Sequence, residues 1–270
     1  MKGPATMKKA LLVGESWTTH MIHQKGFDSF TTTEYVEGGV EYREALEAGG
    51  WQVTHVPAHA VESQFPTSID ALNAYDLVVI SDVGANTFLL TRAVFNRSVS
   101  EPNRLEVLRQ FVLGGGGLLM VGGYLSFSGV DAKANYANSP IAAVLPVGCL
   151  EIDDRAEHPE GVQVEVLDAG HSALGGVGEE WPALLGFNRT TAREDALVLA
   201  RVDGFPLVAV AEAGAGRTGV FTSDMSPHWA PPTFMAWPGY GPLWRALSDW
   251  VAGAGAVRAT ASGVPDESRR

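Results

Sequence analysis

The chain has 270 residues, of which 46% are hydrophobic and 19% are charged, enough to form one large core. Its net charge of −12 excludes a nucleic-acid partner, because no basic stripe is available to neutralise phosphates. The single Cys excludes an intrachain disulfide, and no apolar run reaches the length of a signal-sequence core or a membrane span. We therefore expect a cytoplasmic protein that contacts neither nucleic acid nor membrane.

Apolar runs separated by helical segments fill the first half of the sequence. The expected elements in chain order are a strand over 8–13, a helix over 42–48, a strand over 51–56 and a buried strand over 77–80. The segment after the first strand contains polar and aromatic residues, namely His20, His23, Lys25, Phe27 and Phe30, and is expected to be a long functional loop. Repeated strand-helix-strand units predict a parallel sheet with right-handed crossovers.

The run 118–121 is the expected central strand. A helix over 105–113 precedes it, and glycines 114–117 turn the chain from helix to strand. Gly122 and Gly123 follow the strand directly. An apolar strand between two glycine turns is typical of a parallel strand with both faces buried, so we expect the chemistry just after its carboxyl end.

Proline breaks the second half of the sequence into shorter elements. We expect strands over 162–166 and 196–201, a β-hairpin formed by 206–213 and 217–223, and a closing helix over 243–251. All these elements together predict a single domain over residues 7–252. The small and polar residues 253–270 predict a flexible tail.

The segment from Gly214 to Gly219 matches the dinucleotide-binding pattern GxGxxG letter for letter. That pattern binds a pyrophosphate only where it follows a strand and opens a helix. Here both flanking segments are expected strands, which favours a hairpin turn. No cofactor is therefore expected.

Two further clusters have both a chemical and a structural interpretation. Cys149 with His158 and Glu160 resembles a nucleophile, a base and an orienting group, but the Cys follows no sharp strand-to-helix turn, which favours a packed apolar thiol. The two Asp and the Arg at 153–155 could hold a ligand or a metal, whereas an acidic pair beside Arg favours a local ion pair. The spacing of carboxylates and histidines forms no closed metal motif, so no metal site is predicted.

Polar side chains follow the expected strand ends. They are Glu15 and Ser16 after the first strand, Asp82 and Asn86 after the buried strand, Tyr124, Ser126 and Ser128 after the central strand, and Asp224 and His228 after the late strand. Because the carboxyl ends of parallel strands share one edge, we expect these side chains to enclose a single cleft. The alternative is that Asp82 and Asp224 cap turns and that His228 is an ordinary hydrogen-bonding partner.

Four stretches of the sequence, at 14–17, 75–86, 115–127 and 223–229, resemble the class I glutamine amidotransferase-like superfamily, and the similarity extends over residues 8–252. The most similar group is a set of bacterial cytoplasmic proteins assigned as glutamine amidotransferases. The resemblance implies an α/β fold: a flavodoxin-like three-layer sandwich with a mainly parallel central sheet and an added β-hairpin region. It also places the late His of the family at His228 and its oxyanion-hole turn at Gly84 and Ala85.

The sequence departs from this family at the catalytic nucleophile. Members place a Cys on the turn after the central strand, but Gly122 or Gly123 occupies that position. The Glu that follows the family His by two residues is replaced by Ala230. Because no thiol is available there to attack glutamine, we expect no glutaminase activity.

Two functions remain open. The first is a hydrolase or lyase acting on a small polar metabolite, such as a sugar derivative as in the related trehalose-utilisation-like proteins. Its catalytic residues would be His228, Asp224, Tyr124 and Asp82, with His228 as the general acid or base. The second is a non-catalytic ligand-binding or assembly module on the same scaffold. The expected ligand-binding residues are Glu15, Ser16, Gly84, Asn86, Gly123, Ser126 and Trp229; the expected partner is a small molecule, and a homo-oligomer is compatible with the sequence.

Overall fold

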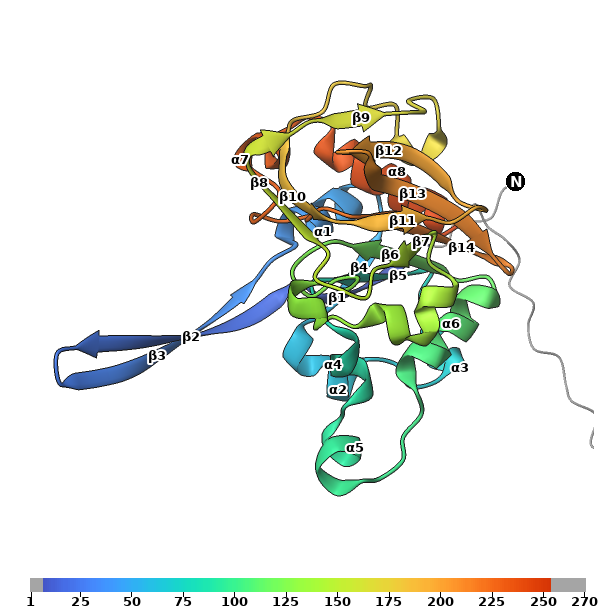
Figure 1. Cartoon of the computed structure of the whole chain (residues 1–270). Coiled ribbons are helices and arrows are strands. Elements are labelled where there is room, and N and C mark those ends of the chain that lie inside the picture. Colours follow the sequence, from blue (N-terminus) through green and yellow to red (C-terminus); the bar gives the residue numbers. More distant parts are fainter. Residues whose placement is uncertain (1–6, 254–270) are drawn as a thin grey trace, which may run out of the picture.

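The computed structural model describes residues 7–253. Its centre is a mixed eight-stranded sheet (Figure 1). Its strands lie in the order β4 (Gln52–Val56), β1 (Lys9–Gly14), β5 (Leu77–Ser81), β6 (Gly117–Val121), β14 (Gly216–Phe221), β13 (Phe205–Ala213), β12 (Leu197–Val202) and β9 (Val164–Val166). The pairs from β4 to β14 are parallel, and the remaining pairs are antiparallel. The carboxyl ends of the five parallel strands therefore point to one edge of the sheet.

Helices cover both faces of this sheet. The helices α1 (Val40–Ala48) and α8 (Tyr240–Val251) pack together on one face, and α2 (Val61–Gln64), α3 (Ile69–Leu72), α4 (Ala85–Leu89) and α6 (Arg104–Leu113) lie on the other (Figure 1). The helix α5 (Arg92–Arg97) lies on a loop beyond α4. Strand β1 is buried on both faces. Ala10 and Leu12 lie in the core beneath α1 and α8, and Leu11 and Val13 lie in the core beneath α6.

The central strand β6 is buried along its whole length, as predicted from its apolar sequence. The helix before it begins after Asn103, whose side-chain oxygen accepts hydrogen bonds from the N–H groups of Leu105 and Glu106, both at 3.1 Å. This cap satisfies backbone donors that have no partner within the helix. The strand lies between β5 and β14, so residues that follow it are close to the ends of both neighbours.

Three two-stranded antiparallel sheets lie outside the main sheet, and two of them pack on the body of the protein. One pairs β8 (Arg155–Val162) with β10 (Leu184–Asn188), and the other pairs β7 (Val147–Cys149) with β11 (Thr190–Ala192). The prediction of a single strand over 162–166 is wrong. Strand β8 ends at Val162 in one sheet, and β9 begins at Val164 in another. Short helices complete the connections: η1 (Ala58–Ala60), η2 (Val130–Ala132), η3 (Tyr136–Asn138), η4 (Pro140–Ala143), η5 (Ser172–Leu174) and α7 (Pro232–Met235).

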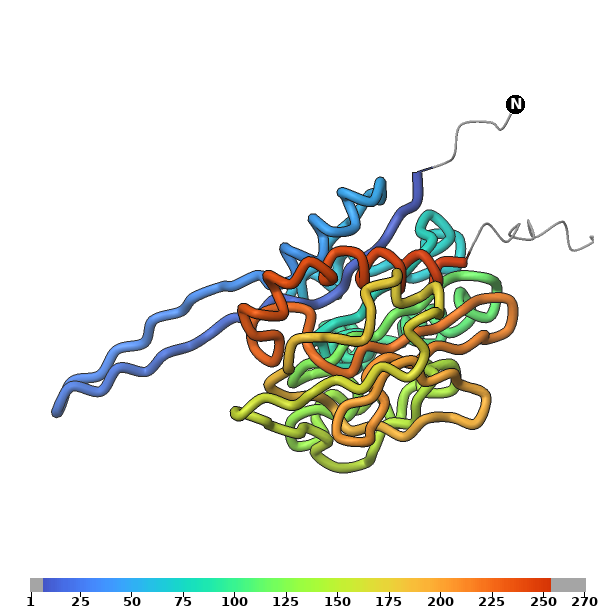
Figure 2. Tube along the Cα trace, turned by 90° about the horizontal axis from the view of Figure 1, so that it is seen from above, coloured from blue at the N-terminus to red at the C-terminus, as the bar shows by residue number. Residues whose placement is uncertain are grey.

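The segment after β1 was expected to be a loop, and this prediction is wrong. It is a β-hairpin of β2 (Ser16–Lys25) and β3 (Asp28–Glu37), paired without interruption from Ser16 with Glu37 to Lys25 with Asp28. Figures 1 and 2 show that this hairpin, which we call the arm (residues 16–37), projects away from the rest of the protein. Both of its faces are exposed, so its sequence lacks the alternation of apolar and polar residues that identifies a half-buried strand.

The hairpin predicted around Gly214 is confirmed, since β13 and β14 are antiparallel neighbours. A strand rather than a helix follows the GxGxxG pattern, so the pattern does not form a pyrophosphate site. No helix within residues 7–253 is long and apolar enough to cross a membrane. The tail expected over 253–270 lies, from residue 254 onward, outside the described residues.

Candidate functional site

A cavity of about 270 Å³ lies at the carboxyl ends of the parallel strands. Its lining residues are Glu15, Trp17, Asp82, Tyr124, Asp224, Ser226, Pro227 and His228. Glu15 follows β1 directly and Asp82 follows β5 directly, while Tyr124 and Asp224 each lie three residues after a strand, β6 and β14 respectively. The shared sheet edge thus brings together residues that are distant in sequence, such as Glu15 and Ser226, which are 211 positions apart.

Three residues at these strand ends have a backbone in the left-handed region. Glu15 has a φ of 44°, Asp82 a φ of 45° and Gly123 a φ of 145°. A Cβ atom at Gly123 would lie 2.8 Å from Asp82 Oδ1, so only glycine fits beside this carboxyl group. Left-handed conformations of non-glycine residues cost about 1–3 kcal/mol each and cluster at functional sites. The fold therefore holds both carboxyl groups in place against local strain.

Glu15 is buried, with 1% of its surface exposed. Its Oε1 accepts a hydrogen bond from the Ser81 hydroxyl, and its Oε2 lies within hydrogen-bond distance of the Ser226 hydroxyl, at 2.6 Å. Burial, together with the nearby carboxyl groups of Asp224 and Asp82, raises the pKa of Glu15 well above its usual range. Burial therefore favours the protonated form of this carboxyl group.

Asp82 is held by the turn that follows β6. Its Oδ1 accepts a hydrogen bond from the Leu125 N–H at 2.7 Å, and its own N–H donates to Ser126 Oγ at 3.1 Å. Burial and the neighbouring Asp224 carboxyl group raise the pKa of Asp82 to about 6. Asp82 is thus a carboxylate at neutral pH whose pKa suits it to accept a proton.

His228 lies at the mouth of the cavity, with 44% of its side chain exposed. Its Nδ1 is 3.6 Å from Asp224 Oδ2, and the Oδ1 of Asp224 accepts a hydrogen bond from the Ser226 N–H at 3.0 Å. The interaction with Asp224 raises the pKa of His228, and the charges of Asp82 and Glu157 act in the same direction. The imidazole is therefore protonated to a larger extent near neutral pH than an isolated histidine.

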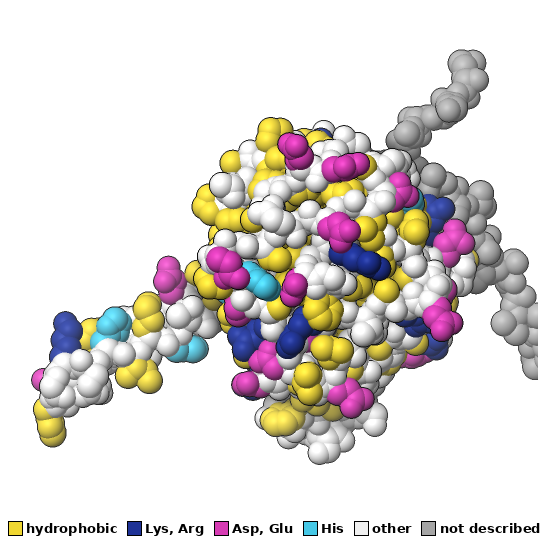
Figure 3. All heavy atoms as spheres, turned by 45° about the horizontal axis from the view of Figure 1, so that its top comes forward, with side chains coloured by type: hydrophobic (Ala, Val, Ile, Leu, Met, Phe, Trp, Pro, Cys, Tyr) yellow, Lys and Arg dark blue, Asp and Glu magenta, His cyan; other side chains and the backbone are white. Residues whose placement is uncertain are grey.

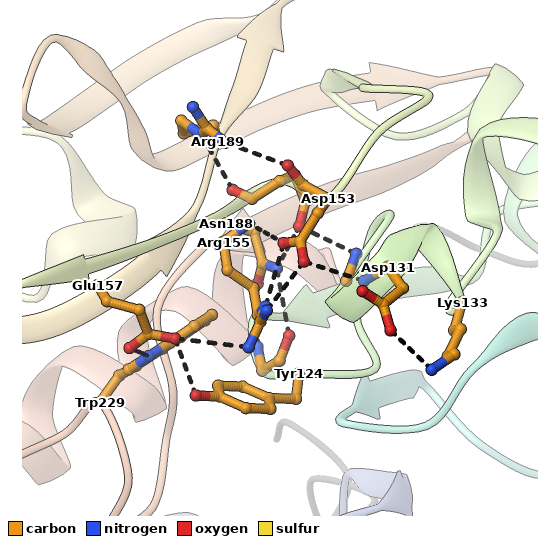
Figure 4. A network of polar contacts seen from close by, with 12 residues as sticks. Tyr124, Asp131, Lys133, Asp153, Arg155, Glu157, Asn188, Arg189 and Trp229 are labelled. Carbon is orange, nitrogen blue, oxygen red and sulfur yellow. Dashed lines mark hydrogen bonds and ion pairs between the residues drawn. The ribbon is translucent and has the colours of Figure 1, made fainter.

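Two aromatic rings, which also contact each other, pack against the His228 imidazole. The Tyr124 ring lies 4.3 Å from it between centroids, and the Trp229 ring stacks on it at 5.7 Å with an interplanar angle of 9°. Glu157 on β8 accepts hydrogen bonds from the Tyr124 hydroxyl at 2.8 Å and from Trp229 Nε1 at 2.9 Å (Figure 4). One carboxylate thus fixes the two rings that orient the histidine.

Arg155 closes the outer side of this network. Its guanidinium group lies over the Tyr124 ring at 4.5 Å and pairs with the Asp153 carboxylate, Nη2 to Oδ2 at 2.8 Å (Figure 4). The local ion pair predicted at 153–155 is therefore confirmed. Asp154 has a different role, because it is buried and accepts a hydrogen bond from Asn188 Nδ2 at 2.8 Å.

Five of the predicted site residues line the cavity, namely Glu15, Asp82, Tyr124, Asp224 and His228. Ser126, Gly123 and Trp229 lie behind this lining and are buried. Ser126 supports the backbone of Asp82, and Trp229 supports the ring of His228. These residues act on the cavity through their neighbours.

The remaining predicted site residues are placed elsewhere. Ser16 is buried and accepts a hydrogen bond from the Ala58 N–H at 2.7 Å, so it fixes the base of the arm. Gly84 precedes helix α4, and Asn86 is exposed on that helix. Neither contributes to the lining of the cavity.

Four residues of the site are not predicted from the sequence, namely Trp17, Ser226, Pro227 and Glu157. Trp17 lies in the segment that was expected to be a loop, and Ser226 was overlooked although it lies between Asp224 and His228. Glu157 had no recognisable signal, because its strand β8 was not predicted and its partners are distant in sequence. A side chain such as Glu157, which positions other residues of the site, can be identified only when the arrangement of the strands is known.

The turn after β6 has no room for a nucleophile. The Gly122 N–H donates to the carbonyl groups of Phe221 at 2.8 Å and Ser223 at 2.9 Å, and a Cβ atom at Gly122 would overlap the Thr222 carbonyl group. Cys149 instead lies on β7, packed against the core, and burial raises its pKa to about 12. This supports a packed thiol over a catalytic one.

The cavity combines groups suited to acid–base chemistry. Asp82 has a pKa of about 6 that suits a base, and the raised pKa of His228 favours the imidazolium form that can give a proton. Burial favours the protonated form of Glu15, which can donate a hydrogen bond. Within residues 7–253, no group of three or more His, Cys, Asp and Glu side chains is arranged to hold a metal ion.

The fold and the site together define a class of protein: an α/β protein with a polar cavity at the carboxyl ends of its parallel strands. The model of the family described as "Putative glutamine amidotransferase" matches residues 9–253, and the chain belongs to this family. The comparison with curated proteins finds no match.

Similar solved structures agree with this assignment. A cytoplasmic protein from Salmonella typhimurium is 47% identical, with 90% of this chain and 98% of that chain covered and a TM-score of 0.87. A second, from Salmonella typhimurium LT2, is 44% identical, with 90% and 99% covered and a TM-score of 0.87. A ThuA-like protein from Parabacteroides merdae is 14% identical, with 97% and 95% covered and a TM-score of 0.54, and it shares the fold alone.

Proposed function

We propose that this protein is an acid–base enzyme, a hydrolase or lyase, that acts on a small polar metabolite in the cavity between Asp82 and His228. The observation that carries the proposal is that both side chains line one cavity and both have pKa values shifted toward neutrality. Titratable groups tuned in this way, in a cleft, are typical of catalytic sites.

The proposed step needs one base and one acid. In a hydrolysis, Asp82 takes a proton from water, the water oxygen attacks the substrate, and His228 gives its proton to the leaving group. In an elimination, Asp82 takes the proton from carbon and His228 again protonates the leaving group. Asp224 orients the imidazole and stabilises its positive charge, and Tyr124 forms a wall against which the substrate packs.

The charges around the cavity restrict the substrate class. The carboxyl groups of Asp82, Asp224 and Glu15 disfavour an anionic ligand and favour hydroxyl or ammonium groups that donate hydrogen bonds. The Trp17 and Tyr124 rings offer apolar faces for a compact ring or chain. We therefore propose a neutral or cationic substrate, such as a polyol, a sugar derivative or an amine.

A ligand screen tests this proposal. We expect polyols, sugar lactones or small amines to raise the melting temperature of the wild-type protein, and inorganic phosphate to have no effect. The effect should be lost in His228→Ala and kept in His158→Ala, a matched control whose imidazole pairs with Glu160 outside the cavity. If the two variants respond alike, the proposed site is wrong.

Turnover separates the enzyme from a non-catalytic binding module. One observation favours the non-catalytic binding module: the turn at Gly122 and Gly123 leaves the cavity without the nucleophile of the family. Ligands from the screen should be converted by the wild type and bound without conversion by Asp82→Asn, as measured by mass spectrometry. Binding without conversion by the wild type would establish the binding module instead.

We further infer a flavodoxin-like layering of the scaffold and a cytoplasmic location. The strand order β4-β1-β5-β6-β14 with helices on both faces supports the first, since it is the order 2-1-3-4-5 of doubly wound sheets. The naming of both similar Salmonella proteins as cytoplasmic supports the second. A single domain over 7–252 remains a prediction.

A further inference from the structure

Beyond Trp17, which lines the cavity, the arm (residues 16–37) is a large feature that the proposed function does not use. Its base is fixed to the body, because the Ala58 N–H donates to Ser16 Oγ at 2.7 Å and the Tyr35 ring packs edge-on against His59 at 5.1 Å. Beyond this base the arm extends into solvent (Figures 1 and 3). Phe27, at its tip, is completely exposed.

Both faces of the arm carry apolar side chains. Met21 and Ile22 are 39% and 78% exposed, and as consecutive strand residues they lie on opposite faces. Phe30 on β3 is 49% exposed. A two-stranded ribbon is only marginally stable in water, and clustered exposed apolar side chains mark an interaction site. The arm therefore needs a partner surface on both faces, which its own body does not supply.

The charge of the arm favours a second copy of this chain as that partner. Its distal part, 18–33, contains one Lys and one Asp and two His residues, whereas the whole chain has a net charge of −12. Two bodies of this charge repel each other, but the neutral, histidine-bearing distal part of the arm meets an acidic body without this repulsion. The same acidic body would be repelled by an anionic membrane or by nucleic acid.

The size of the arm fits such a contact. Each of its strands has ten residues, which at about 3.3 Å per residue span about 33 Å. A standard interface uses roughly 20–30 residues on each side, and the two strands nearly supply this number. We propose that the arm is an assembly element that packs reciprocally against a second copy of this chain. Trp17, at the base of the arm, lines the cavity, so the arm joins the body beside the site.

Light scattering of the full-length protein tests the proposal. The wild type should have a mass that is a multiple of 28.7 kDa, and Ile22→Ser combined with Phe27→Ser and Phe30→Ser should reduce it to 28.7 kDa with unchanged far-UV circular dichroism. The control Phe95→Ser removes a side chain that is 71% exposed on α5 and should leave the mass unchanged. A wild type of 28.7 kDa at every concentration, or an arm variant that stays assembled, overturns the proposal.

A photo-crosslinker at position 27 gives a second test that does not depend on the folding of the triple variant. Phe27 is fully exposed, so p-benzoylphenylalanine fits there without disturbing the core. Irradiation of the purified protein should join two copies, with the crosslink on the body or arm of the second copy. Crosslinks within one chain only, or none, would contradict reciprocal packing.

Discussion

The Ser226 hydroxyl lies 2.6 Å from Glu15 Oε2 and joins the residues that follow β14 and β1. The same hydroxyl is 3.2 Å from Asp224 Oδ1, yet it has a single hydrogen and cannot donate to both carboxyl groups. A proton on Glu15 satisfies all three groups, because Glu15 then donates to Ser226 and Ser226 donates to Asp224. The raised pKa of Glu15 agrees with this arrangement, which links a buried acid to the partner of His228.

This arrangement predicts how stability changes in Glu15→Gln. Because the folded-state pKa of Glu15 lies above its unfolded value, its contribution is complete below about pH 4 and is lost as pH rises through the folded-state pKa. Gln mimics the neutral carboxyl group, so the free energy of unfolding of the variant relative to wild type should rise with pH, by at most about 1.4 kcal/mol per pH unit. Urea unfolding across this range measures the difference.

The matched control for this prediction is Glu212→Gln, at a side chain that is 78% exposed. Its stability curve should run parallel to that of the wild type. A parallel curve for Glu15→Gln as well would mean that Glu15 is ionised in the folded protein.

Cys149 should behave as a packed thiol. With its pKa raised to about 12 by burial, it should react slowly with a thiol reagent, and the rate should still rise above about pH 9, where a thiol with a pKa of about 8.5 levels off. The unfolded protein should react quickly. Fast stoichiometric labelling of the folded protein would show that the thiol is accessible and activated.

The absence of a nucleophile on the turn after β6 predicts that the protein releases no ammonia from glutamine. Neither Gly122 nor Gly123 can carry a side chain without a steric clash, and Cys149 lies on β7, packed against the core. A coupled ammonia assay on the wild type and on Cys149→Ala should give the same background rate. Glutaminase turnover that disappears in Cys149→Ala would restore the thiol as the nucleophile.

Glu157 should act on the site through the rings that it holds. Gln at this position can accept only one of the two hydrogen bonds and removes a negative charge, so Glu157→Gln should lower the pKa of His228 and weaken ligand binding. The control Glu160→Gln changes the same kind of side chain on the same strand, where it is 70% exposed. An unchanged His228 titration in Glu157→Gln would limit Glu157 to a packing role.

Most of the parallel sheet could be predicted from the sequence, because strands with both faces buried are apolar throughout. The runs that became β1, β5 and β6 show this pattern, and the rule that parallel strands end at one edge then predicts that Glu15, Asp82 and Tyr124 meet. The structure places these three side chains on one cavity.

The rest could not be predicted because its signals are not local. The arm is exposed on both faces, so no hydrophobic period identifies it as two strands. The contact of Glu157 with Trp229 depends on the pairing of β8 with β10, which is set by the fold as a whole. Left-handed conformations at Glu15 and Asp82 could not be predicted either, because only a small fraction of non-glycine residues adopt them.

The pKa of His228 tests most directly whether Asp82 and His228 form a coupled acid–base pair. It is measured by NMR from the imidazole Cε1–H signal, which is assigned by comparison with His228→Gln. The wild type should show a pKa above 6.5, and Asp82→Asn should lower it, because the negative charge of Asp82 stabilises the imidazolium. Asp195→Asn, at an ion pair with Arg193, should leave it unchanged. A wild-type pKa at or below 6.5, or the same pKa in Asp82→Asn, would contradict the account.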